Sequence, residues 1–245
     1  MSTPDEPARK SQPNWLLPLA GVAAVVLAAG LYWSQTRQPA GPPATTVAVT
    51  SPASETAAGV PDFPLAELLV PGPLPDNVLG NAKAPVTIVE YASMTCPHCA
   101  NFHTTTFKEL KTKYIDTGKA KLIFREFPLD NLAASVSLLS RCVEPSKFFG
   151  FIGVMFENQQ VWAYGEGDPR PRLLVLAKQA GFTEESFNKC ITDQAMLDKV
   201  VAVRQRADDV FKVGSTPTFF INGHLLKGGG DLAEFETLMA PYLPK

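Results

Sequence analysis

The spacing of apolar and polar positions after residue 85 first predicts a strand, a helix and a second strand. VTIVEY at 86–91 and AKLIFREF at 120–127 are short runs rich in β-branched and apolar residues, which suit buried strands. Between them, apolar residues recur at helical spacing and indicate a helix over about 97–114. We expect the two strands to be parallel, since a right-handed helical crossover connects them.

The pattern then changes to a helical block of about 80 residues, at about 131–212. Proline and glycine residues divide this block into segments, and no good strand is found in it. Its four predicted helices are Leu132 to Cys142, Ser146 to Val161, Arg172 to Ala180, and Glu184 to Phe211.

Two strands and a helix are predicted to end the chain. The strands at 218–221 and 225–227 flank the Asn-Gly pair at 222–223, which is a strong signal for a tight hairpin turn. A helix from Leu232 to Tyr242 follows, with Asp231 as its expected N-cap. The whole order describes a small α/β sheet that carries a helical insertion.

The N-terminal region has a different pattern. Residues 15–33 form an apolar run of 19 residues without a charged side chain, which as a helix would nearly cross a hydrocarbon core of about 30 Å. Arg9 and Lys10 precede the run, and this charge bias favours a cytoplasmic N-terminus. We therefore expect a transmembrane anchor within residues 1–37, and a cleaved signal peptide is the alternative.

Prolines separate this run from the predicted domain. Of the 22 prolines, 14 lie in the first 85 residues, so this part cannot form a packed core. We expect a Pro/Ala-rich tether over 38–77 and a folded domain over 78–245. Apolar residues return from Phe63 to Leu79, and packing of this piece on the edge of the domain is the alternative for the end of the tether. With the anchor retained, the domain would be held at the inner (cytoplasmic) membrane and would lie in the periplasm or outside the cell. If the leader is cleaved as a signal peptide, the domain would be soluble in the periplasm.

The composition excludes one class of partner and raises the question of redox chemistry. Charged residues make up 19% of the chain and the net charge is −2, which gives no electrostatic basis for binding nucleic acid. All four cysteines lie in the predicted domain, and their even number permits full pairing in an oxidising compartment.

Cys96 and Cys99 form a C-x-x-C motif where the first strand gives way to a helix. Pro97 suits the first helical position, which places Cys96 at the helix N-terminus. Backbone N–H groups and the helix dipole stabilise a thiolate there, and His98 adds N–H donors and positive charge. We predict that Cys96 is the nucleophile and that Cys99 resolves mixed disulfides.

Two other interpretations of the motif are a structural zinc site and an inert disulfide. A zinc site needs about four ligands, often as a second C-x-x-C or a histidine pair, and no second pair accompanies this motif. We therefore expect no metal. Two cysteines three residues apart at a helix start are more typical of redox chemistry.

The segment VTIVEYASMTCPHCANF, followed about 120 residues later by VGSTPTFFING, resembles the thioredoxin superfamily and, within it, the DsbA-like thiol:disulfide oxidoreductases. The resemblance covers about residues 78–245 and implies an α/β thioredoxin fold with an inserted all-helical block. It also implies a disulfide oxidase that acts on exported proteins.

The resemblance assigns further residues to the site. Pro217 matches the cis-proline of the family, so Thr216 is expected to lie against the cysteines and to offer main-chain groups to an extended client. Glu90 matches a buried acid that relays a proton for Cys99, although a solvent-facing strand acid is the alternative. Arg125 or Glu126 is a candidate partner for Glu90.

The remaining chemistry-bearing residues have simpler interpretations. Cys142 and Cys190 are expected to form a structural disulfide in an exported chain, and free thiols or a secondary redox pair are the alternatives. His103 is expected to be a polar residue on a helix face.

We therefore predict an enzyme that donates its Cys96–Cys99 disulfide to reduced, unfolded exported proteins and needs no cofactor. A membrane partner that reoxidises the enzyme is implied by the resemblance, and we expect a monomer. A disulfide isomerase or reductase is the first alternative. A peptide-binding module and a metal chaperone are the others.

Overall fold

The computed structural model describes residues 62–244. The predicted anchor and residues 38–61 of the predicted tether lie outside the described residues. Within 62–244, no helix combines the length and the apolar character needed to cross a membrane.

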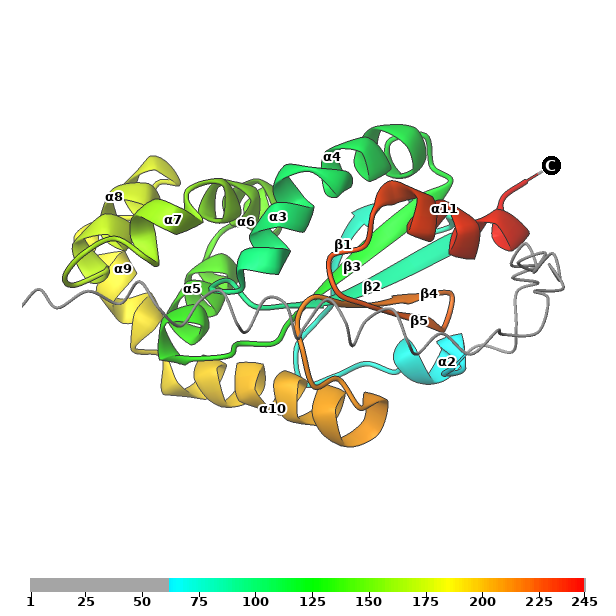
Figure 1. The fold of residues 1–245 in the computed structure, drawn as a ribbon. Coiled ribbons are helices and arrows are strands. Elements are labelled where there is room, and N and C mark those ends of the chain that lie inside the picture. The colour runs from blue at the N-terminus through cyan, green and yellow to red at the C-terminus, as the bar shows by residue number, and fades with distance from the viewer. Residues whose placement is uncertain (1–61, 245) are drawn as a thin grey trace, which may run out of the picture. The chain divides into compact units, whose positions relative to one another are not determined.

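A five-stranded sheet forms the centre of the described part of the chain, in the order β1-β3-β2-β4-β5 (Figure 1). β2 and β3 are parallel, as predicted, and the other neighbouring strands are antiparallel. The strands are β1 (Asn77–Gly80), β2 (Val86–Ala92), β3 (Ala120–Glu126), β4 (Thr218–Ile221) and β5 (His224–Lys227).

Helices cover both faces of this sheet (Figure 1). Helices α3 (Pro97–Thr104), α4 (Thr106–Leu110) and α11 (Leu232–Met239) lie on one face, and α2 (Leu65–Leu68) and α10 (Gln194–Phe211) lie on the other. Side chains alternate along β2, so Val86 and Ile88 pack toward α3 and α11, whereas Val89 and Tyr91 pack toward α10. Glu90 follows on the face of Ile88, beneath α3.

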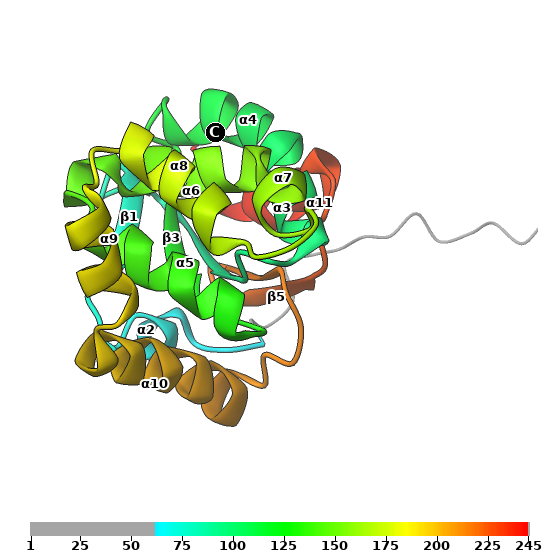
Figure 2. The ribbon, with the colours of Figure 1, turned by 90° about the vertical axis from the view of Figure 1, so that its left-hand side faces the viewer.

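The helical insertion between β3 and β4 is confirmed (Figure 2). Phe151, Trp162 and Phe187 are buried in its core. Its elements are α5 (Asn131–Cys142), a 3-10 turn (Pro145–Lys147), α6 (Phe148–Glu157), α7 (Gln159–Trp162), α8 (Arg170–Gln179), α9 (Glu184–Ile191) and α10.

Three predicted helices are divided in the structure. The helix predicted over 97–114 breaks at Thr105, where the Thr104 and Thr105 hydroxyls donate to carbonyl groups one turn earlier, and α4 then runs into a π-helical turn (Lys111–Ile115). The helix predicted over 146–161 is interrupted at Asn158. The helix predicted over 184–211 is divided at Asp193, whose side chain caps α10 by accepting from the Met196 N–H.

The C-terminal hairpin and helix agree with the prediction. Asn222 and Gly223 both have positive φ, 47° and 96°, as the tight turn between β4 and β5 requires. Asp231 caps α11 in a reciprocal capping box with Glu234. The helix ends at Met239, and a 3-10 turn (Ala240–Tyr242) replaces its predicted last residues.

Residues 62–77, which we assigned to the tether, pack on the domain. Leu68 of α2 is fully buried, and Phe63 makes edge-to-face contacts with Phe211 and Phe220. Asp76 accepts two hydrogen bonds from Arg125 at 2.8 and 2.9 Å. The folded part therefore begins before residue 78, and a short helix and an edge strand are added to the predicted elements.

Candidate active site

The two cysteines of the C-x-x-C motif lie at the start of α3, just beyond the end of β2. Cys96 is the N-cap of the helix and Pro97 occupies its first turn. Cys96 is 5% exposed and Cys99 is fully buried, whereas Pro97 and His98 are exposed. Both cysteines are free thiols. A reacting partner therefore has access to Cys96 before Cys99.

The loop before β4 closes over the Cys96 sulfur. The peptide bond between Thr216 and Pro217 is cis. The Cys96 thiol donates to the Thr216 carbonyl oxygen with an S-to-O distance of 3.2 Å. The Thr216 hydroxyl is buried and has no hydrogen-bond partner among residues 62–244, so it can turn and donate to a thiolate.

The environments of the two sulfurs move their pKa values in opposite directions. The Cys99 thiol donates to the Cys96 sulfur and is the largest cause of the lowered pKa of Cys96. Thr216 and the backbone N–H groups of Cys99 and His98 also donate to this sulfur. Together these donors outweigh the effect of burial and lower the pKa of Cys96 to about 5. Burial raises the pKa of Cys99, and the Cys96 thiolate and Glu90 raise it further. The pair therefore holds one thiolate and one thiol near neutral pH.

His98 contributes through its main chain. Its backbone N–H is directed at the Cys96 sulfur, whereas its side chain is exposed. The sequence predicts that the His98 side chain supplies donors and charge to Cys96. The hydrogen bond that the structure shows from His98 to the Cys96 sulfur comes from its backbone N–H.

Glu90 is fully buried and its partner is His103. The Nε2 atom of His103 lies 2.9 and 3.1 Å from the two carboxyl oxygens of Glu90. Neither candidate partner named from the sequence contacts it. Arg125 binds Asp76 and the Tyr91 hydroxyl, and Glu126 accepts two hydrogen bonds from Arg141.

His103, expected from the sequence to be a polar residue on a helix face, is buried on that face. It is only 5% exposed, and its ring lies against Phe156 of α6. The sequence could have indicated this position, because His103 is seven residues after Cys96 and so lies on nearly the same face of the helix.

Three polar residues support the loop before Cys96, and sequence reasoning did not single them out. The Gln159 side-chain amide donates to the carbonyl groups of Met94 and Cys96. The Tyr164 hydroxyl donates to the Thr95 carbonyl. The Thr95 hydroxyl donates at 2.6 Å to Asp130, which also caps α5. The insertion thus holds the loop that presents the nucleophile.

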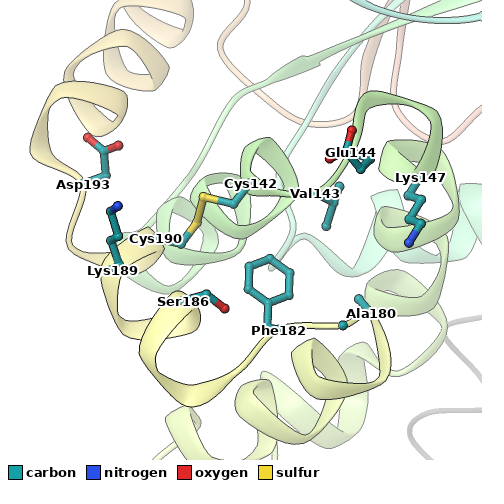
Figure 3. Close-up of a pocket in the computed structure, with 11 residues that line it drawn as sticks. Cys142, Val143, Glu144, Lys147, Ala180, Phe182, Ser186, Lys189, Cys190 and Asp193 are labelled. Atoms are coloured by element: carbon teal, nitrogen blue, oxygen red, sulfur yellow. A yellow bond between two sulfur atoms is a disulfide. The ribbon is translucent and has the colours of Figure 1, made fainter.

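Cys142 and Cys190 form a disulfide between α5 and α9, at the wall of a separate hollow of about 440 Å³ (Figure 3). Cys142 is exposed and Cys190 is 4% exposed. Phe182 and Ser186 also line the hollow, but neither Cys96 nor Cys99 does. The disulfide therefore belongs to the insertion and not to the site of the free thiols.

The arrangement at Cys96 and Cys99 suits thiol–disulfide chemistry. The two sulfurs can form and open one disulfide, which is a two-electron exchange. Within 62–244, no group of three or more His, Cys, Asp or Glu side chains is placed to hold a metal ion.

Comparisons with known proteins identify the family. The thioredoxin family model matches residues 74–240. A Rickettsia bellii protein, named a protein-disulfide oxidoreductase, is 36% identical over 149 residues, which are 60% of this chain and 57% of that protein. The chain thus spans little more than half the length of the curated relatives it matches.

Solved structures agree with this result. The crystal structure of α-DsbA1 from Wolbachia pipientis has a TM-score of 0.66 and 35% sequence identity, and the match covers 72% of this chain and 94% of that one. BdbD from Bacillus subtilis has a TM-score of 0.60 and 25% identity, with 68% and 92% covered. The chain therefore belongs to the thioredoxin superfamily and is a DsbA-like member of it.

Proposed function

We propose that this protein is a thiol:disulfide oxidoreductase in which Cys96 is the nucleophile and Cys99 the second, buried thiol. The observation that carries the proposal is the contrast between the two sulfurs. Cys96, at the N-cap of α3, has its pKa lowered to about 5, while burial raises the pKa of Cys99, one turn further along the helix. At neutral pH the accessible sulfur is the reactive thiolate.

The reaction proceeds by two thiolate attacks. A client thiolate attacks Cys96 in the Cys96–Cys99 disulfide, a client–Cys96 disulfide forms, and Cys99 leaves as a thiolate that takes up a proton. A second client thiolate then attacks the client sulfur, which releases Cys96 as a thiolate and leaves the client with a new disulfide. The client loses two electrons and the protein gains them.

We further propose that the physiological direction is oxidation of client thiols. Interactions that stabilise the Cys96 thiolate stabilise the reduced protein, and this makes its disulfide a stronger oxidant. The donors around Cys96 support this direction, and a disulfide isomerase or reductase remains the alternative. Relatives in Bacillus that are named disulfide bond formation protein D are consistent with it.

Clients are proposed to bind as extended chains across Thr216 and Pro217. The Thr216 carbonyl accepts from Cys96 only while that sulfur is a protonated thiol, so it is without this donor in the thiolate and in the disulfide. It can then accept from a client backbone N–H, as in strand addition. We propose that these clients are exported proteins and that a membrane partner or small oxidant reoxidises Cys99 and Cys96, with the domain in the periplasm.

The test is the reduction potential of the full chain, measured by equilibration with glutathione and by counting free thiols. A value well above that of thioredoxin, about −270 mV, and toward that of DsbA, about −120 mV, supports the oxidase. A value near thioredoxin contradicts it and favours a reductase.

Two variants test the roles of the cysteines on a reduced peptide that contains two cysteines. Cys96→Ser is expected to abolish its oxidation, and Cys99→Ala is expected to accumulate mixed disulfides with it. Cys142→Ala, combined with Cys190→Ala, is the matched control and should still oxidise the peptide. Undiminished turnover by Cys99→Ala would refute the two-cysteine mechanism.

A further inference from the structure

His103 and Glu90 form a buried polar pair beneath the cysteines. The His103 and Glu90 side chains are 3% and 0% exposed, and Nε2 of the imidazole lies 2.9 and 3.1 Å from the two carboxyl oxygens. Glu90 has no other side-chain partner among the described residues. Since an isolated buried polar or charged group is costly, each of the two side chains depends on the other as its partner.

Other charges on the elements around the pair already have partners. On β3, Arg125 binds Asp76 and Glu126 binds Arg141. On the flanking helices, Lys108 of α4 pairs with Glu157 of α6 at the surface. The charged group that acts on His103 is therefore Glu90, which in turn acts on the Cys99 sulfur.

Aromatic rings from three elements enclose the imidazole. The ring of Phe156 on α6 is stacked on it, with centroids 4.4 Å apart and an interplanar angle of 17°. Phe107 lies 4.9 Å from it and Phe124 of β3 lies 6.1 Å away. A face-on aromatic ring stabilises a cation, so the site tolerates a protonated His103. The helical insertion, which supplies Phe156, thereby completes the pair.

We propose, on the basis of the thiol:disulfide exchange proposed above, that His103 is a positioning residue for that reaction. It orients the Glu90 carboxyl toward Cys99 and lets the pair take up one additional proton. Glu90 alone, as a carboxylate, would oppose a second anion at Cys99. With His103, the pair becomes Glu90–COOH and imidazolium when it accepts a proton, and its positive charge then balances the Cys99 thiolate.

The pair acts in both directions of exchange. When a client thiolate opens the Cys96–Cys99 disulfide, Cys99 leaves as a thiolate and takes up a proton that the pair has first accepted from solvent. When a mixed disulfide on Cys96 is resolved, the Cys99 proton passes to the neutral pair, the Cys99 thiolate attacks the Cys96 sulfur, and the thiolate bound to Cys96 departs. No electron passes through His103 or Glu90.

The test separates the two sulfurs in time. The reduced full-length protein is mixed with one equivalent of dithiobis(nitrobenzoic acid), whose coloured thiolate is released in two phases. In the first phase Cys96 attacks the reagent, and in the second Cys99 attacks the resulting mixed disulfide. Both rates are recorded from below pH 5 to above pH 8 in the wild type and in His103→Gln.

His103→Gln is expected to slow the second phase by about tenfold or more near neutral pH and to shift its inflection upward, because each pKa unit on Cys99 changes its thiolate fraction tenfold. The first phase should change by less than about twofold. Glu90→Gln should also slow the second phase. The variant that combines His103→Gln with Glu90→Gln should be no slower than the product of the two single rate reductions predicts. His103→Lys, which restores a cation that does not titrate in this range, should recover the rate without the inflection.

His224 supplies a matched control. It is the first residue of β5 at the edge of the sheet, is also buried, at 7% exposure, and has its Nε2 atom 2.8 Å from the Tyr242 hydroxyl. His224→Gln should leave both phases unchanged. A second phase with wild-type rate and pH profile in both His103→Gln and Glu90→Gln would overturn the role of the pair. A first phase without an inflection near pH 5 in the wild type would instead contradict the proposed nucleophile.

Discussion

The carbonyl oxygen of Thr216 lies 3.2 Å from the sulfur of Cys96, although 120 positions separate the two residues in the chain. The whole helical insertion lies between them in sequence. Because β2 and β4 are neighbours in the sheet, the loop that precedes β4 reaches the helix that follows β2. The reactivity of Cys96 therefore depends on a residue from the far side of the insertion.

Thr216→Val removes a hydroxyl from this loop while nearly conserving the shape of the side chain. We expect the pKa of Cys96 to rise from about 5, because the Thr216 hydroxyl is one of the donors to the thiolate. Loss of one hydrogen bond to a charged group is worth about 1.5–3 kcal/mol, or about one to two pKa units. The ultraviolet absorbance of the thiolate, followed against pH in the reduced protein, measures the change.

Thr218→Val is the matched control for this substitution. Thr218 is the first residue of β4, two positions after Thr216, but its hydroxyl donates to the Ser215 carbonyl at 2.7 Å and not to a sulfur. Removal of the Thr218 hydroxyl should leave the pKa of Cys96 unchanged. If both variants shift the titration equally, the effect comes from the loop conformation and not from the Thr216 hydroxyl.

The stability of the reduced protein should rise with pH relative to that of the oxidised protein. The pKa of Cys96 is lowered from 9.0 to about 5 on folding, so between these values the unfolded chain binds one more proton than the folded one. The stabilisation is complete above the pKa of Cys96 in the unfolded chain, 9.0, and is lost as pH falls through its pKa in the folded protein, about 5. The gap should change by up to about 1.4 kcal/mol per pH unit.

Urea unfolding of both redox forms at several pH values measures this gap. The two forms differ covalently only at Cys96 and Cys99, so the difference in stability reports on these thiols. Cys99 acts only at higher pH, where its raised pKa opposes the gain. The free energy of unfolding of reduced Cys96→Ser should lack this rise with pH. If the difference in stability between reduced and oxidised wild type does not change between pH 5 and 8, Cys96 is not an activated thiol.

Local signals explain how much of the fold the sequence predicts. β-branched runs placed β2, β3 and β4, the Asn-Gly pair placed the last hairpin, and Asp231 marked the start of α11. Each of these features depends on residues near one another in the chain. Cys96 and Pro97 at a helix start likewise indicate their own environment, because capping is local.

The features that the sequence does not predict depend on tertiary contacts. β1 is four residues long and is stabilised by pairing with β3, and α2 is a single turn whose Leu68 is buried under the sheet. The sequence offers candidate partners for Glu90 on the neighbouring strand. Its partner lies on α3, because the helix packs directly over that strand face and brings His103 to the carboxyl.

The disulfide between Cys142 and Cys190 should stabilise the fold without setting the reactivity of Cys96. It closes a long loop within the insertion, with a sequence separation of 48. Cys142→Ala combined with Cys190→Ala should lower the free energy of unfolding by about 2–4 kcal/mol, measured in urea. The thiolate titration of Cys96 should not change, since the disulfide lies at a separate hollow. A shifted titration would favour a secondary redox pair that tunes the site.

Arg141 and Glu126 connect the insertion to the sheet through a buried ion pair, and breaking it should be costly. Their side chains are 8% and 1% exposed, with bonds of 2.6 and 2.7 Å between them. Arg141→Ala leaves the Glu126 carboxylate buried without its partner, which typically costs about 3–5 kcal/mol. Arg141→Ala combined with Glu126→Ala should cost less, because no unpaired charge remains.

The surface ion pair of Lys111 and Asp116 provides the comparison for the free energy of unfolding of Arg141→Ala. Its shortest bond is 2.7 Å, close to that of the buried pair, but its side chains are 41% and 50% exposed. Lys111→Ala should therefore change the free energy of unfolding by less than about 1 kcal/mol. Equal losses in the two single variants would mean that burial does not decide the strength of these pairs.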